Sequence, residues 1–204
     1  METRERILSR TAELFQIMGM KSLTMDFIAV DLGISKRTIY ELFKDKDELV
    51  LHAVEYWIKS NNAKLMEFVD QTDNVIEAIF VIIDHQHKQM TSKNLIIFED
   101  LKKIFVRLNA SWHTNREKCS EFSVSFALLE RGKKEGVFRD ELKIDVVDSF
   151  IFELVNLFHS SEGIRLMKLS RKEALENIFL PYFRGICTVN GQELIDSYLH
   201  KLEL

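Results

Sequence analysis

The chain has 204 residues, 46% of them hydrophobic, which is enough for a buried core in one medium domain or in a small head on a larger body. One Pro and seven Gly favour an all-α fold with short connections. The net charge is −4, and the first fifty residues carry eight Lys or Arg against nine Asp or Glu, so a strongly basic nucleic-acid-binding domain is excluded. Any DNA-binding surface must be a local positive patch.

The sequence contains no sign of a targeting or membrane segment. The N-terminal residues METRERILSR include no apolar signal region, and the longest apolar run, 78–83, is too short to span a membrane. Two cysteines are too few for a disulfide framework and predict free thiols, with Cys119 the better candidate for a redox role because polar residues surround it. We therefore expect a cytoplasmic protein.

Residues 3–18 form the first predicted element, an amphipathic helix. Ile7, Leu14 and Phe15 lie on its apolar side, and Gly19 is placed to end it. We expect this helix to brace the next two, with Phe15 packing against Ile28, Ile39 and Phe43.

Residues 24–43 have the pattern of a helix-turn-helix. Thr24 is an N-cap residue, Gly33 suits a left-handed helix end, and Ser35 caps a second helix over 36–43. Two short helices joined by a turn with Gly are typical of this motif, whose second helix enters the DNA major groove. Asp45 and Glu48 then form a capping box that opens a long helix.

The second helix divides into two faces. The residues spaced to pack inward are Ile39, Leu42 and Phe43. The residues left outward are Lys36, Arg37, Thr38, Tyr40 and Glu41. A helix whose first turn carries Lys, Arg and Thr is suited to insertion into a groove.

The spacing of these signals resembles the DNA-binding domain of TetR-family transcriptional regulators, over about the first quarter of the chain. The residues that carry the resemblance are Ile7, Ala12, Leu14, Phe15, Gly19, Leu23, Thr24, Ile28, Ala29, Leu32, Gly33, Ile34, Ser35, Thr38, Ile39, Tyr40, Phe43 and Lys46. Asp31 departs from the small or neutral residue usual in the family. The resemblance implies a three-helix head over residues 1–46 and a larger helical effector-binding and dimerisation body over 47–204.

The resemblance also implies which residues contact DNA. The predicted set is Thr24, Ser35, Lys36, Arg37, Thr38, Tyr40 and Lys46. Lys36, Arg37 and Thr38 would read base edges, and Arg37 suits guanine because its fork fits O6 and N7 together. Tyr40 and Lys46 would hold phosphates, with Thr24 adding a contact at its helix N-terminus. The alternative for Tyr40 is a core residue, and for the lysines and Arg37 plain surface charge.

In the body, the apolar pattern predicts helices over 47–69, 74–90, 95–108, 111–132, 145–161 and 170–187, and a short one after Asn190. Asp145 and Ser170 are predicted caps, and Pro181 should kink or end its helix. The run 132–139 resembles the family's link between its seventh and eighth helices. By the same resemblance, helices 145–161 and 170–187 would pair with those of a second subunit as a homodimer.

The resemblance places an effector pocket in the body. The candidate lining residues are Phe80, His87, Phe98, Phe105, Trp112, Phe122 and Phe126, each of which could equally be an ordinary core residue. The effector expected is small and apolar or amphipathic. His85 and His87 point to opposite sides of a helix, so we expect no metal site, and no cofactor or catalytic motif is found in the sequence.

These observations favour a homodimeric transcriptional repressor, not an enzyme, that binds a pseudo-palindromic double-stranded DNA operator and is released by the effector. Two alternatives stay open. One is a regulator whose body senses a protein partner. The other is a helical ligand-binding protein with a vestigial DNA-binding head, which the net charge of −1 over the first fifty residues favours.

Overall fold

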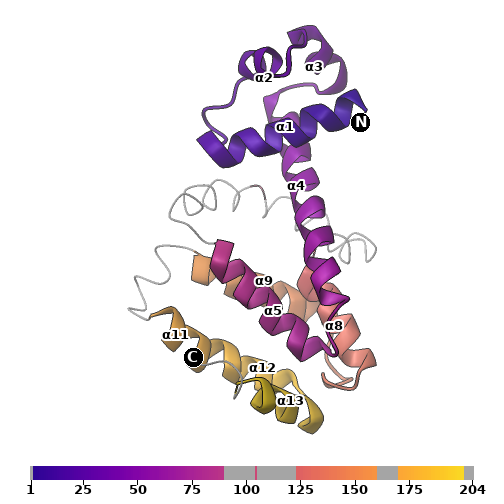
Figure 1. The fold of residues 1–204 in the computed structure, drawn as a ribbon, viewed down its shortest axis with the longest axis vertical. Coiled ribbons are helices and arrows are strands. Elements are labelled where there is room, and N and C mark those ends of the chain that lie inside the picture. Colours follow the sequence, from indigo (N-terminus) through magenta and orange to yellow (C-terminus); the bar gives the residue numbers. More distant parts are fainter. Residues whose placement is uncertain (1, 90–103, 105–122, 160–169, 200–204) are drawn as a thin grey trace. The chain divides into compact units, whose positions relative to one another are not determined.

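The computed structural model describes residues 2–89, 104, 123–159 and 170–199, and these are predominantly helical (Figure 1). Within these ranges, β pairing is limited to one antiparallel bridge between Phe138 and Cys187. The predicted all-α fold is therefore confirmed. The predicted helix 95–108, apart from Ile104, lies outside the described residues, as do the candidate redox residue Cys119 and the pocket candidates Phe98, Phe105, Trp112 and Phe122.

The described residues form two compact units. The first contains residues up to Ala63 together with Ile104, and the second contains the rest. Helix α4, Lys46–Val69, contributes its first residues to one unit and its last to the other. The functional boundary at residue 46 stays a prediction.

The first unit is the predicted helix-turn-helix head. Its helices are α1, Thr3–Met18, α2, Met25–Leu32, and α3, Lys36–Leu42, followed by the start of α4 (Figure 1). Gly19 and Gly33 end α1 and α2 with φ of 78° and 65°, values that glycine adopts without steric cost. The predicted helix bounds are confirmed to within one residue.

The head has an aromatic core. Phe15, Ile28, Ile39 and Phe43 are buried, as predicted. Trp57 of α4 packs edge-on against Phe15, with ring centroids 5.9 Å apart, so α4 also closes this core. The prediction that Leu42 packs inward is wrong, because α3 ends at Leu42 and leaves its side chain 39% exposed.

Asp31, the departure from the family pattern, joins two helices of the head. Arg10 donates to both carboxylate oxygens, from Nε to Oδ2 at 2.6 Å and from Nη2 to Oδ1 at 3.0 Å. This fork-like contact with the Arg10 guanidinium holds the pKa of Asp31 below its ordinary value. The pair fastens α1 to α2.

The second unit packs around a separate core. Its helices are α5, Val75–Gln89, α8, Val124–Lys134, α9, Ile144–His159, α11, Arg171–Ala174, the π-helical segment η1, Leu175–Phe179, α12, Leu180–Ile186, and α13, Val189–Leu199. Helix α5 packs against α8 and α13, α8 packs against α9, and α12 packs against α13. Pro181 lies in the first turn of α12, directly after the π-helical segment. The α-helix predicted to kink or end at Pro181 is therefore interrupted by a turn of π-helix, which is wider than an α-helical turn.

Three predictions about helices in this unit are wrong, namely the continuity of the helix 111–132, whose residues 111–122 lie outside the described part, and the caps at Asp145 and Asn190. Ser123 is extended and caps α8 by accepting from Phe126 N at 3.1 Å, so a helix running through from 111 to 132 is broken there. Asp145 lies inside the first turn of α9. The last helix starts before Asn190, because the Thr188 hydroxyl accepts from Gly191 N at 3.2 Å and caps α13.

The link after α8 packs as its resemblance implies. Val137 N and Phe138 N both donate to the Gly132 carbonyl, at 2.8 and 3.1 Å. The Phe138 ring lies so close to Gly132 that a Cβ there would be 2.2 Å from Phe138 Cδ2. Thr188 N donates to the Val137 carbonyl at 2.9 Å, which joins this link to the start of α13.

Arg131 of α8 fastens the turn between α4 and α5. Its Nη1 donates to the Val69 carbonyl at 2.7 Å and to Thr72 Oγ1 at 3.0 Å, and its Nη2 donates to the Thr72 carbonyl at 2.8 Å. Glu135 pairs with Arg131 Nε at 2.5 Å and accepts from Val75 N at 2.7 Å. Backbone groups at the end of α4 and the start of α5 are thereby satisfied.

None of the helices in the described ranges is both long enough and apolar enough to cross a membrane.

Candidate DNA-binding surface

Both helices of the helix-turn-helix, α2 and the recognition helix α3, are capped at their N-termini. Thr24 Oγ1 accepts from Phe27 N at 3.1 Å, and Ser35 Oγ accepts from Thr38 N at 3.1 Å. Gly33 is left-handed, and its N–H donates to the Val30 carbonyl at 3.1 Å. The predicted capping roles of Thr24, Gly33 and Ser35 are confirmed. Together they fix the angle at which α3 leaves α2.

The predicted DNA-reading side chains lie on the solvent side of α3. Lys36, Arg37 and Tyr40 are exposed, and Thr38 is half-buried, with its hydroxyl 2.9 Å from Ser35 Oγ. Tyr40 is 47% exposed, so it is not a core residue. Ile39, on the opposite side of the helix, is fully buried and anchors α3 in the head. The structure thus brings five of the seven predicted DNA-contact residues together at one short helix and its cap.

Lys46 stands at the start of α4, half-buried, with Nζ donating to the Lys21 carbonyl at 3.3 Å. Asp45 caps α4 through a bond from Glu48 N to Asp45 Oδ1 at 2.9 Å. The predicted capping box differs in its second half, because the Glu48 carboxylate accepts from Lys44 N at 2.5 Å. This arrangement still satisfies two backbone donors at the start of the helix.

Both cations of α3 are paired with carboxylates of the head. Lys36 Nζ lies 2.8 Å from Asp26 Oδ2 and 5.9 Å from the centre of the Tyr40 ring. The hydrogen bond to Asp26 raises the pKa of Lys36 above its ordinary value. Arg37 Nε lies 2.9 Å from Glu41 Oε1.

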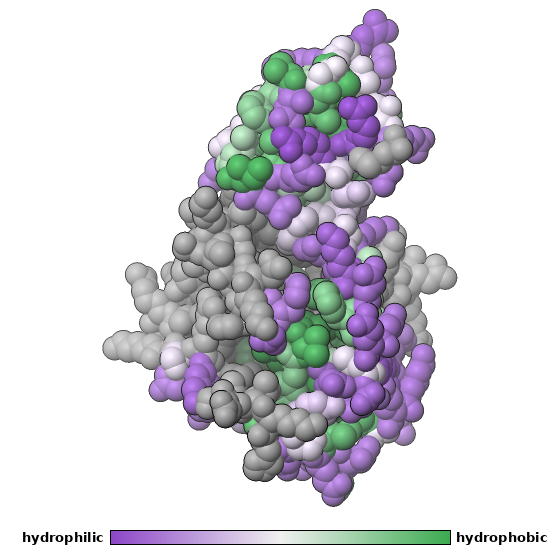
Figure 2. Space-filling view, in the orientation of Figure 1, coloured by the Kyte–Doolittle hydropathy of each residue, from purple (hydrophilic) through white to green (hydrophobic). Residues whose placement is uncertain are grey.

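Our sequence analysis missed both of these carboxylate partners. The four-residue spacing of Arg37 and Glu41 is a signal for an ion pair on a helix. The pair between Asp26 and Lys36 has no such signal, because it joins two different helices. The upper part of Figure 2 accordingly shows hydrophilic and hydrophobic residues intermixed on the head.

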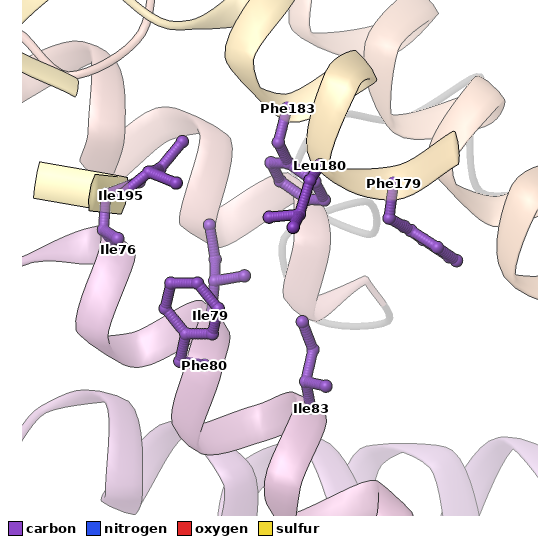
Figure 3. A pocket seen from close by; sticks show the side chains of 8 residues that line it. All are labelled: Ile76, Ile79, Phe80, Ile83, Phe179, Leu180, Phe183 and Ile195. Carbon is purple, nitrogen blue, oxygen red and sulfur yellow. The ribbon is translucent and has the colours of Figure 1, made fainter. Parts of the chain in front are cut away.

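The predicted effector-pocket residues are described only in part. Phe80 on α5 is half-buried and Phe126 on α8 is buried, whereas His87 belongs to α5 with its side chain outside the described part. Phe80 lines a cavity of about 20 Å³, together with side chains of α5, η1, α12 and α13 (Figure 3). The lining residues are Ile76, Ile79, Phe80, Ile83, Phe179, Leu180, Phe183 and Ile195.

This cavity is wholly apolar and has room for about one water molecule. Phe126 is not among its lining residues. Sequence reasoning missed the other seven, although the nearly continuous apolar run 75–83 indicated burial on several sides. Across the described ranges, no three His, Cys, Asp or Glu side chains are grouped closely enough to hold a metal ion.

Comparison with known proteins supports the DNA-binding assignment of the head. The family described as bacterial regulatory proteins, tetR family, matches residues 7–53. The HTH-type transcriptional repressor KstR2 of Mycobacterium tuberculosis is 28% identical over 156 residues, covering 72% of this chain and 75% of KstR2. The HTH-type transcriptional regulator YvaF of Bacillus subtilis is 28% identical over 186 residues, covering 89% of this chain and 94% of YvaF.

The similarity in fold covers most of the chain. The structure of a TetR-family protein from Vibrio parahaemolyticus matches with a TM-score of 0.59 at 19% identity, covering 92% of this chain and 100% of that protein. A capped recognition helix on a helical body defines the class, a helix-turn-helix DNA-binding protein. The head is a TetR-family DNA-binding domain, and the chain is a DNA-binding transcriptional regulator. The resemblance inferred from the sequence is confirmed.

Proposed function

We propose that this regulator is a homodimeric repressor that acts in the cytoplasm, binds a pseudo-palindromic DNA operator and is released by a small apolar or amphipathic effector. The observation that carries the proposal is the capped helix α3, which presents Lys36, Arg37 and Tyr40 to solvent. Lys36, Arg37 and Thr38 read base edges, and Tyr40 and Lys46 hold phosphates. That KstR2 is a repressor supports repression as the sign of regulation.

A second subunit is needed because one short helix reads only one half-site. Two heads related by a twofold axis place their α3 helices in major grooves about one helical turn apart. An apolar patch on the second unit supports dimerisation. On α9, Val146 is 60% exposed and Phe150 is 50% exposed, and the Phe150 ring contacts that of Tyr182 on α12 with centroids 4.8 Å apart. A monomer at micromolar concentration would contradict this part of the proposal.

The effector would act by binding more tightly to the state that cannot span the operator, because a ligand shifts an equilibrium only by its differential affinity. The apolar side chains beside Phe80 would suit an apolar ligand, although the cavity that they line has room for only about one water molecule. The small volume of that cavity also supports a second candidate, a body that senses a protein partner. Effector-dependent loss of operator binding by the purified protein separates the two.

The deciding experiment is selection of binding sites from a randomised duplex pool at low salt. We expect wild type to enrich an inverted repeat. The variant Tyr40→Ala/Lys46→Ala should lose the enrichment, because it lacks the two side chains proposed to bind phosphates in each head. Lys172→Ala is the matched control, since it removes an exposed lysine from α11 in the second unit. If the double variant enriches the same repeat with unchanged affinity, the assignment of Tyr40 and Lys46 is wrong.

A further inference from the structure

The recognition helix carries its cations already bound to carboxylates. Asp26 lies in the first turn of α2 and reaches across to Lys36 in the first turn of α3, while Glu41 lies one turn after Arg37 on α3 itself. Carboxylates of the head therefore neutralise the positive charges of the helix that is expected to enter the negatively charged groove.

These ion pairs contribute little to the fold. The side chains of Lys36 and Asp26 are 47% and 69% exposed, and those of Arg37 and Glu41 are 88% and 59% exposed. Pairs so open to water are weak and are screened by salt. The buried Ile39, the Thr24 and Ser35 caps and the Arg10–Asp31 contact hold the helices in place without them.

We propose that Asp26 and Glu41 are specificity-determining residues, which suppress non-specific DNA binding by holding Lys36 and Arg37 in intramolecular ion pairs. This inference rests on the proposed DNA-contact role of Lys36 and Arg37. A phosphate that binds Lys36 or Arg37 either displaces the paired carboxylate or lies close to it, and in both cases the carboxylate repels the phosphate. Non-specific complexes depend almost entirely on such phosphate contacts, so they lose most.

The geometry of Arg37 leaves base reading intact. Glu41 accepts from Nε, so the two terminal nitrogens, Nη1 and Nη2, stay directed away from that contact. A guanidinium can donate from these two nitrogens to O6 and N7 of guanine while its Nε keeps the carboxylate. Glu41 thus acts as a positioning residue that fixes the plane of the Arg37 fork and lowers the entropy lost on binding guanine.

The salt dependence of binding tests this inference. When a free cation binds a phosphate, a counterion leaves the DNA; when a paired cation binds, the vacated carboxylate takes up a cation from solution, which cancels part of that release. Removing the carboxylates should therefore steepen the slope of log K against log salt by up to about 0.9 for each pair in a bound protomer. A purely structural role for Asp26 or Glu41 would leave the slope unchanged.

The experiment measures binding of wild type, Asp26→Asn, Glu41→Gln and the double variant to a random-sequence duplex and to the selected operator, over about 50 to 200 mM salt. We expect random-duplex affinity to rise roughly two- to fivefold for each pair removed, with steeper slopes. We also expect the ratio of operator to random-duplex affinity to fall. Glu13→Gln is the matched control, because it removes the same charge from the head while Arg10 keeps Asp31.

Random-duplex affinities and slopes equal to those of Glu13→Gln would overturn the inference while leaving the proposed function standing. Failure of wild type to bind either duplex at low salt would instead overturn the proposed function. Melting temperatures of the variants, expected to match that of wild type, show whether a lost affinity reflects a lost fold.

Discussion

Replacing Arg131 tests how the second unit is held together. Arg131→Ala removes three hydrogen bonds to the turn between α4 and α5, one to the Val69 carbonyl and two to Thr72. The Arg131 side chain is 26% exposed, so water can reach part of the site. We therefore take the value for an ordinary hydrogen bond, about 1 kcal/mol each, which lies below the range for charged hydrogen bonds. The expected loss is about 3 kcal/mol.

For a chain of this size, about 3 kcal/mol corresponds to a fall in Tm of roughly 6–12 °C. Circular dichroism during heating measures it. Arg131→Lys should recover only part of the loss, because an ammonium cannot span the same set of acceptors. Arg184→Ala is the control in the same unit, since Arg184 forms an exposed pair with Asp196 that is expected to contribute no more than about 1 kcal/mol. If Arg131→Ala melts within about 2 °C of Arg184→Ala, the hydrogen bonds of Arg131 to Val69 and Thr72 do not stabilise the second unit.

Three further predictions follow from contacts described above. Gly132→Ala should destabilise the second unit by about 1–3 kcal/mol, measured by urea unfolding, because its Cβ would overlap the Phe138 ring; Phe138→Leu in the same chain should recover part of the loss. Burial raises the pKa of the Cys187 thiol to about 11, so in a Cys119→Ser background alkylation at pH 8 should be roughly a hundredfold slower in the folded than in the unfolded protein; equal rates would contradict the burial. Asp31→Asn should be less stable than wild type at neutral pH. Because the folded-state pKa of Asp31 is lowered, that difference should close as the pH falls from about 4 through the folded-state value, and a difference independent of pH would rule the ion pair out as its cause.

The head could be predicted because its signals are local. Thr24 and Ser35 cap the helices that directly follow them, and Gly33 ends the helix directly before it. Each signal lies within a few residues of its effect, so the sequence specifies it without knowledge of the fold. The predicted bounds of α1 and α2 are accordingly correct to the residue.

The contacts that sequence analysis missed are those that join distant segments. Asp31 meets Arg10 across 21 positions, and Lys36 meets Asp26 across 10. The start of α13 is a similar case, since Thr188 and Asn190 are both good caps. Tertiary structure selects Thr188, because its hydroxyl also donates to the Gly136 carbonyl at 2.7 Å.

The cavity beside Phe80 could not be predicted from the sequence either, because its lining residues come from α5, η1, α12 and α13 and share no periodic pattern. Apolar spacing predicts that Ile76 and Ile79 face a core, and gives no indication of which distant helix covers them.

The hydrogen bonds between Thr188 and the link after α8 have a consequence for folding during synthesis. The hydrogen bond from Thr188 to the Val137 carbonyl spans 51 positions, so α13 cannot dock on this link until synthesis has passed Thr188 and α13 itself. The three helices of the head lie within the first 42 residues, and their contacts can form much earlier. The recognition helix can therefore form during synthesis before the second unit is complete.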